Sequence, residues 1–177
     1  MRQTQKQYQY DAVGNLTKQT NTTTSTAVTE FERTYDSNRT ICGGLSGQVC
    51  SAKDGNGNVT SYSYNQYGDI LTVTPPAPLG QTIYTYDSLG RVQTVKDGNN
   101  ATTTYQYDVR DRIARTTFNN GQYVNQTYYP NGLAKTQTDS AGGAKTFEYD
   151  GEGRITKQTG PQTGVKPDPV SRTVLVC

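Results

Sequence analysis

Aspartate is the residue type in this chain best placed to do chemistry, because it recurs at a fixed place beside tyrosine. Five aspartates follow a tyrosine directly: Asp11, Asp36, Asp87, Asp108 and Asp150. Two carboxylates can hydrolyse a glycoside, but a catalytic pair occurs once, whereas these acids recur in equivalent positions. We therefore expect each to bond a backbone N–H in a turn. The chain has no histidine, which removes Ser–His and Cys–His catalysis and the commonest metal ligand. These residues predict that the chain is not an enzyme.

The cysteines offer a second kind of chemistry. Cys42, Cys50 and Cys177 contain no Cys-x-x-Cys pair, so we expect no zinc site, no other metal and no cofactor. A disulfide between Cys42 and Cys50 would close a loop and add about 2.5 kcal/mol on the chain-entropy model. Two reduced thiols in a mobile loop are the alternative, and the sequence leaves both open because the redox compartment is unknown.

The elements that position these residues are read from a repeated tyrosine motif. Its core is Tyr-x-Tyr-Asp with a glycine four residues after the second tyrosine, as in Tyr84-Thr85-Tyr86-Asp87-Ser88-Leu89-Gly90. The second tyrosine recurs as Tyr10, Tyr35, Tyr64, Tyr86, Tyr107, Tyr128 and Tyr149. The first-tyrosine place includes Tyr84 and Tyr105. The glycine place holds Gly14, Gly68, Gly90, Gly132 and Gly153, and it holds Arg39 and Asp111 in the other two copies. The spacing settles at about 21 residues, which indicates a repeat architecture.

The residue pattern within one repeat predicts a β-hairpin. Alternating residues predict strands over 81–87, 91–96 and 101–107, separated by turns that begin at Asp87 and Asp97. We expect consecutive antiparallel hairpins in one continuous curved sheet, with the Tyr-x-Tyr pairs of adjacent repeats stacked as an aromatic ladder. The first two repeats are longer, and the insertion in the second contains Cys42 and Cys50.

Composition and charge limit the kinds of partner that the chain is expected to bind. The formal net charge is +2 and Lys and Arg are scattered, so a nucleic-acid surface is disfavoured. No apolar stretch approaches the roughly 20 residues of a membrane helix, and the polar first residues do not resemble a signal peptide. The first motif copy begins at Tyr8, which is what a fragment of a longer array would show.

The motif copies resemble the YD-repeat, or Rhs (rearrangement-hotspot), family, which is related to the shells of insecticidal toxin complexes and to teneurins. The resemblance covers roughly residues 8 to 158. It implies an all-β segment of a spiral shell. In the family the shell encloses a toxic C-terminal domain and is exported or lies at the cell surface. Carbohydrate binding has also been attributed to these repeats. Self-cleavage is not carried over to Asp168, because the glycine of the family's Asp-Pro-x-Gly motif is absent after Pro169.

The sequence thus predicts a repeat array over 1–160 and an irregular tail over 161–177. The predicted function is structural: a wall segment of an Rhs-type shell that encapsulates or presents a polymorphic toxin. Its partners would be the rest of the shell and the enclosed toxin. The alternative is a surface module that binds glycans or a protein. Its ligand-facing candidates are Tyr67, Tyr123 and Tyr129, because they lie outside the two motif tyrosine places. We also expect self-association through the sheet edges.

Overall fold

The computed structural model describes residues 4–23 and 26–160, and these ranges contain fourteen β-strands and no helix. The strands of the first half are β1 (Thr4–Tyr10), β2 (Leu16–Thr23), β3 (Thr26–Tyr35), β4 (Val49–Asp54), β5 (Val59–Tyr64), β6 (Ile70–Thr74) and β7 (Thr82–Tyr86). Those of the second half are β8 (Val92–Lys96), β9 (Thr102–Tyr107), β10 (Ile113–Thr117), β11 (Tyr123–Tyr128), β12 (Ala134–Asp139), β13 (Ala144–Tyr149) and β14 (Ile155–Thr159). The described residues hold no helix long and apolar enough to cross a bilayer.

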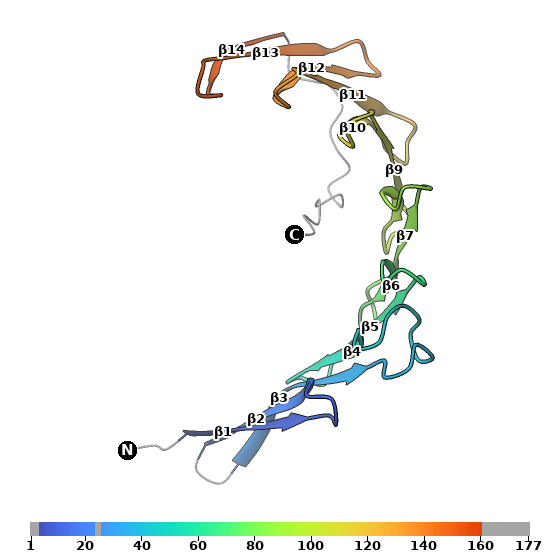
Figure 1. Cartoon of the computed structure of the whole chain (residues 1–177), viewed down its shortest axis with the longest axis vertical. Helices are drawn as coiled ribbons and strands as arrows, with labels where there is room; N and C mark the ends of the chain where they lie inside the picture. Colours follow the sequence, from blue (N-terminus) through green and yellow to red (C-terminus); the bar gives the residue numbers. More distant parts are fainter. Residues whose placement is uncertain (1–3, 24–25, 161–177) are drawn as a thin grey trace. The chain divides into compact units, whose positions relative to one another are not determined.

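The strands pair in chain order. The sheet runs from β1 to β14 with each strand beside its sequence neighbours, and the strand pairs are antiparallel (Figure 1). The chain divides into two compact units, Met1–Tyr84 and Thr85–Cys177. The all-β fold of tandem antiparallel hairpins is therefore confirmed, while its curvature and its closure into a spiral stay predictions. The predicted tail and Asp168 lie outside the described residues.

One turn geometry joins the strands of most hairpins. In the turn that begins at Asp87, the Asp87 amide donates to the Arg91 carbonyl and the Gly90 amide donates to the Asp87 carbonyl. The fourth residue, Gly90, has a left-handed φ of +79°. This is the three-residue hairpin loop in which a type I turn is followed by a left-handed residue. Where the motif lacks glycine, Arg39 and Asp111 adopt the same conformation, with φ of 64° and 61°.

The turn predicted at Asp97 differs from its sequence signal. Asp97-Gly98 is a typical two-residue hairpin signal, yet the residue with positive φ is Asn100, at 65°. The Asn100 amide donates to the Asp97 carbonyl, as Gly90 does to Asp87. Asparagine tolerates this conformation better than most residues, so the turn keeps the geometry of the motif turns.

A β-bulge follows the turn in the repeats. In the hairpin of β9 and β10, Tyr107 pairs with Ile113 and Gln106 pairs with Arg115, so Ala114 is an extra residue. Equivalent register shifts lie beside Tyr10, Tyr35, Tyr64, Tyr128 and Tyr149. A bulge bends its strand and re-aims side chains. In the second repeat the extra residue is Cys50, because Tyr35 pairs with Val49 and Thr34 with Ser51.

The sheet has very little apolar core among the described residues. The buried apolar side chain is Cys50, which is 6% exposed, and the buried polar ones are Asp36 and Asp139. A sheet with two wet faces gains little from apolar burial. The strand ladder and the contacts between repeats must therefore supply most of the stability.

We expect Gly90→Ala to lower the free energy of unfolding by about 1 kcal/mol, because a Cβ is unfavourable in the left-handed region. The space itself is free, since nothing lies within 4 Å of an added Cβ at Gly90. Gly151→Ala is the matched control, because Gly151 also has open space but no positive φ. Urea denaturation of both variants measures the difference. Equal stability of the two alanine variants would contradict the strain argument.

Candidate functional site

The second tyrosine of the motif bonds to the preceding repeat through its hydroxyl. The Tyr107 hydroxyl donates to the Val92 carbonyl at 2.7 Å, and the Tyr128 hydroxyl donates to the Ile113 carbonyl at 2.8 Å. Tyr64 donates to Val49 in the same way. Each acceptor is the first residue of the returning strand of the repeat before. The bond therefore ties each of these three hairpins to its predecessor.

The second repeat makes the same contact with the first repeat, whereas the last repeat departs from it. The Tyr35 hydroxyl donates to the Leu16 carbonyl at 3.0 Å. Tyr149 instead meets the ring of Tyr129 edge-on, with ring centroids 6.1 Å apart. The predicted ladder joins motif tyrosines of adjacent repeats, whereas this edge-on contact joins Tyr149 to Tyr129, which lies outside the motif places. Tyr35, Tyr64, Tyr107 and Tyr128 instead bond to the preceding repeat through their hydroxyl groups.

An arginine four residues after the motif aspartate covers the tyrosine ring of the next repeat. The Arg91 guanidinium lies 4.5 Å from the centre of the Tyr107 ring, and Arg112 lies 4.2 Å from that of Tyr128. Arg91 also bonds Asp87 and reaches Asp111 of the next turn, each at 2.6–2.7 Å. A guanidinium over an aromatic face is stabilising by about 0.5–1 kcal/mol at an exposed site.

The motif aspartates are acceptors in their own turns. Asp108 Oδ1 accepts the amides of Arg110 and Arg112, and Oδ2 accepts the Arg112 side chain. The bond from the Arg112 side chain is the main cause that lowers the Asp108 pKa to about 2. The pKa of Asp87 is likewise lowered, chiefly by the side chain of Arg91. These carboxylates already accept hydrogen bonds from backbone amides and from an arginine side chain.

Asp36 occupies the same motif place but is enclosed by the inserted loop of residues 36–48. Its side chain is fully buried. Oδ1 accepts the amides of Asn38 and Thr40, and Oδ2 accepts those of Ile41 and Cys42. Burial alone would raise the Asp36 pKa, but these backbone donors outweigh it and the pKa lies below its usual value.

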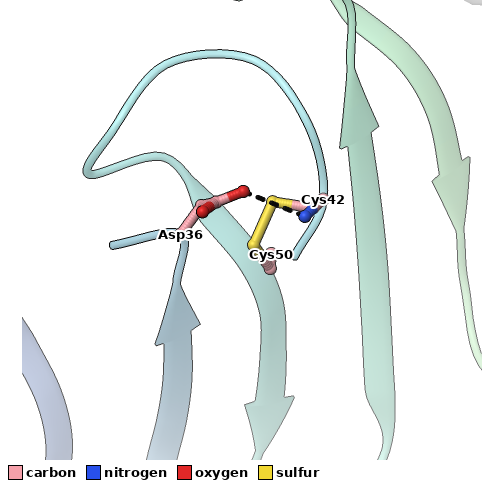
Figure 2. Close-up of side chains that lie close together, drawn as sticks. All are labelled: Asp36, Cys42 and Cys50. Carbon is pink, nitrogen blue, oxygen red and sulfur yellow. Dashed lines mark hydrogen bonds between the residues drawn. A yellow bond between two sulfur atoms is a disulfide. The ribbon is translucent and has the colours of Figure 1, made fainter. Parts of the chain in front are cut away.

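A disulfide closes this loop over the carboxylate. Cys42 and Cys50 are joined, with their Cα atoms 5.4 Å apart. Figure 2 shows the disulfide beside Asp36 and the bond from the Cys42 amide to its carboxylate. The bulge places Cys50 there, because the extra residue of β4 leaves the ladder and faces the loop.

The loop also holds the following repeat. The Cys42 carbonyl accepts the Tyr64 amide at 2.9 Å, and the Gln48 side chain donates to the Gly68 carbonyl at 2.8 Å. A Cβ at Gly43 would lie 2.6 Å from the Tyr64 carbonyl oxygen, so this approach requires glycine. The inserted loop is therefore a clamp between the second and third repeats.

The cluster of Asp36, Cys42 and Cys50 has the residue types of a metal site, with ligand atoms within 4.8 Å of one another. Its chemistry does not fit a cation. Both sulfurs are in the disulfide, and the carboxylate faces four N–H donors. Such donors stabilise an anion, so the cluster is a buried, hydrogen-bonded carboxylate.

The three candidate ligand-facing tyrosines have different surroundings. Tyr67 is 73% exposed at the turn between β5 and β6. Tyr123 is half-buried, with the Arg115 guanidinium 3.9 Å from its ring centre. Tyr129 is half-buried and its hydroxyl donates to the Phe147 carbonyl at 3.0 Å. A ligand-facing role stays a prediction, and Tyr67 offers the most accessible ring of the three.

We expect Tyr128→Phe to lower the free energy of unfolding by about 1 kcal/mol, the usual net value of one hydrogen bond. The reason is that the Ile113 carbonyl loses its partner from the next repeat. Tyr67→Phe is the matched control, because the exposed Tyr67 side chain makes no such bond among the described residues. Denaturant titration of both variants is the measurement. A Tyr67→Phe effect as large as that of Tyr128→Phe would contradict the assignment.

The sequence analysis does not identify Arg91, Arg112 and Gln48 as residues that contact the next repeat. A signal was available: the residue four places after the motif aspartate is arginine at Arg91, Arg112 and Arg154. In the second repeat, the residue directly before the returning strand β4 is Gln48, just as Arg91 directly precedes β8. The Gln48 side chain also bonds to the next repeat. Arg91 and Arg112 in this place cover the tyrosine ring of the next repeat.

The fold and these contacts define a β-hairpin repeat protein whose repeats are bonded in series. The Teneurin YD-shell family model matches residues 46–167. The chain belongs to this family, and the membership predicted from the motif is confirmed. No curated protein matches the sequence.

Solved toxin-complex structures share the fold. The crystal structure of TcdB2-TccC3-Cdc42 is 15% identical, with a TM-score of 0.53 over 89% of this chain and 10% of that one. The Tc holotoxin pore of Photorhabdus luminescens, with a TccC3 mutation, is 13% identical, with a TM-score of 0.54 over 89% of this chain and 12% of that one. TcdB2-TccC3 without its hypervariable C-terminal region is 19% identical, with a TM-score of 0.53 over 91% of this chain and 8% of that one. The chain thus spans about a tenth of the length of these structures.

Proposed function

We propose that this chain is a non-catalytic wall segment of a YD shell that encapsulates or presents a toxin. The family match over residues 46–167 supports a shell role. The observation that carries the proposal is the serial bonding of the repeats through tyrosine hydroxyls. A wall must resist opening between its strands, and these bonds act at that boundary. The mechanism is steric, because the wall separates the toxin from the producing cell.

The carboxylates support a structural role for the motif. Asp87 and Asp108 each accept two backbone amides and an arginine side chain. A general acid needs a raised pKa near the working pH, whereas the pKa of both is lowered. The motif residues therefore serve the architecture, and the partners of this segment are the rest of the shell and its toxin. Export or cell-surface location belongs to the complete shell.

The test begins with the DNA that flanks the reading frame, followed by protease protection of the complete protein. We expect further YD repeats and an Asp-Pro-x-Gly core in the flanking sequence. We then expect a C-terminal domain that resists protease until the shell is denatured. A frame that stands alone between unrelated genes, or a toxin domain cleaved as fast as in its free form, would refute the proposal.

Glycan or protein binding is the second candidate function, and the exposed ring of Tyr67 is the observation that favours it. An aromatic face can pack against an apolar face of a sugar ring. Retention of the chain on a glycan array should fall when Tyr67 is changed to alanine and persist in a Tyr123→Ala variant that remains folded. Equal retention of the Tyr67→Ala variant and the parent would exclude Tyr67 as a sugar site.

A further inference from the structure

Arg115 of β10 carries a charge that no carboxylate balances in the part of the chain that the structure describes. Arg91, by contrast, pairs with both Asp87 and Asp111. Arg115 donates from Nε to the side-chain oxygen of Asn125 at 2.7 Å, and its Nη1 and Nη2 atoms make no hydrogen bond to a described residue. The residue is half-buried. Since a half-buried charge without a counter-ion is costly, the unused donors indicate a place for an anion.

The equivalent place in the other hairpins lacks this unpaired charge. It consists of the residue between the two motif tyrosine places and the residue opposite it on the returning strand, here Gln106 and Arg115. In four hairpins two hydroxyls bond each other there: Thr34–Ser51, Ser63–Thr72, Thr85–Thr94 and Thr127–Thr136. In the first and last hairpins the cation is paired, Lys18 with Glu32 and Lys157 with Glu148. Among the described strands, Arg115 is thus the cation of this place without an acidic partner.

Two neighbours hold the Arg115 guanidinium in one orientation. Asn125 accepts the bond from Nε, and the Tyr123 ring centre lies 3.9 Å from the guanidinium carbon. Asn125 is held in turn, because its side-chain nitrogen donates to the Thr138 hydroxyl at 3.4 Å. A side chain that is already fixed loses little conformational freedom when a ligand binds. The parallel N–H donors of Nη1 and Nη2 match the two oxygens of a carboxylate.

The sheet face around Arg115 is polar and carries no acid. Residues opposite one another on paired strands share a face of the sheet. One row across β9, β10, β11 and β12, which are neighbours in the sheet (Figure 1), consists of Gln106, Arg115, Asn125 and Thr138. Thr117 and Tyr123 lie opposite each other in the adjacent row. Because the other side chains of these rows are neutral, a carboxylate that approaches Arg115 meets no like charge in them.

We propose that Arg115, held in place by Tyr123 and Asn125, binds a carboxylate of an acidic polypeptide. Nη1 and Nη2 donate to the two carboxylate oxygens, and the exposed Gln106 offers an amide beside them. A polypeptide is favoured over an acidic sugar because Arg115 already covers a face of the half-buried Tyr123 ring, so that face cannot pack on a sugar. Tyr123 is then a positioning residue. The site goes beyond the proposed wall function, because it requires only this face of the sheet.

The test is a titration of the ¹⁵N-labelled full chain with a capped tri-glutamate peptide, followed by the NMR signals of the Arg115 Nε–H and the Asn125 side-chain amide. We expect both signals to shift until they saturate. A capped tri-glutamine peptide, which has the same length and no charge, should leave both unchanged. Arg115→Gln should weaken tri-glutamate binding by at least about tenfold, because both bonds to the carboxylate are lost.

Arg33→Gln is the matched control for the loss of a positive charge. Arg33 also lies over an aromatic ring, 4.7 Å from the centre of Phe31, but it is exposed and belongs to the other compact unit. Its variant should bind tri-glutamate as tightly as the parent. If Arg33→Gln weakens binding as much as Arg115→Gln does, the peptide responds to net charge alone and the proposal is wrong.

Conservative variants separate the site from charge attraction and from loss of folding. Arg115→Lys keeps the charge without the parallel donors and should weaken binding about fivefold, as expected for one lost hydrogen bond. Tyr123→Leu should also weaken binding, whereas Tyr123→Phe, which keeps the ring, should restore it. Parent-like binding by Arg115→Lys would overturn the proposal. So would the absence of a shift with tri-glutamate, and tri-galacturonate as the better ligand would assign the site to an acidic sugar instead.

Discussion

Reduction of the Cys42–Cys50 disulfide is expected to lower the free energy of unfolding of the N-terminal unit by about 2.5 kcal/mol on the chain-entropy model. The bond closes a loop with a sequence separation of 8 residues. Its loss frees the loop that supplies the Cys42 amide to Asp36 and the Cys42 carbonyl to the Tyr64 amide. The effect therefore extends beyond the loop to the start of the third repeat.

Two measurements test this effect. Urea denaturation with and without a thiol reductant, in a Cys177→Ser background, gives the global value. Hydrogen exchange of the Tyr64 amide gives the local one, with the amides of β9 as the control because they lie in the other unit. A Cys42→Ser/Cys50→Ser variant should not respond to reductant. Unchanged stability and unchanged Tyr64 exchange after reduction would show that the disulfide does not hold the clamp.

The inserted loop both supplies donors to the motif aspartate Asp36 and contacts the next repeat. Asp108 obtains its third donor from Arg112, whereas Asp36 obtains further backbone donors because the disulfide folds the chain back over it. Gln48 then stands where three later repeats carry Arg91, Arg112 and Arg154. The insertion thus replaces an arginine contact with a covalently closed loop, and both solutions join one repeat to the next.

The turns could be predicted from the sequence because their chemistry is local. Asp87 and Gly90 form their turn from contacts within five residues, so a spacing rule captures them. The strands expected over 81–87, 91–96 and 101–107 match β7, β8 and β9 to within one residue at each end. The alternation of side chains along each strand, together with the turn residues, is sufficient to predict this part of the fold.

The contacts between repeats could not be predicted in the same way. The Tyr107 hydroxyl reaches the Val92 carbonyl of the preceding repeat, and this contact depends on how neighbouring hairpins pair rather than on local spacing. From the sequence alone, ring stacking is the reasonable expectation. The sequence leaves the disulfide open for a similar reason, because the distance between Cys42 and Cys50 depends on where the bulge places Cys50.

Acid is expected to destabilise the sheet over a defined pH range. The pKa of Asp11, Asp36, Asp54, Asp87, Asp108 and Asp150 is lower in the folded chain than its ordinary value of 3.8. A lowered pKa means that the folded state binds the proton less readily than the unfolded chain. Their contribution is therefore complete above about pH 4 and is lost as the pH falls through the folded pKa.

Asp108 gives the sharpest form of this prediction, because its folded pKa is about 2. An Asp108→Asn variant lacks the titrating group. The wild type should exceed the variant in stability most at neutral pH. The difference should shrink from about pH 4 downward and vanish below about pH 2, as Asp108 in the folded chain becomes protonated and resembles asparagine. Urea denaturation at a series of pH values measures it. A difference that stays constant from neutral pH to pH 2 would show that the Arg112 contact does not depend on the charge of Asp108.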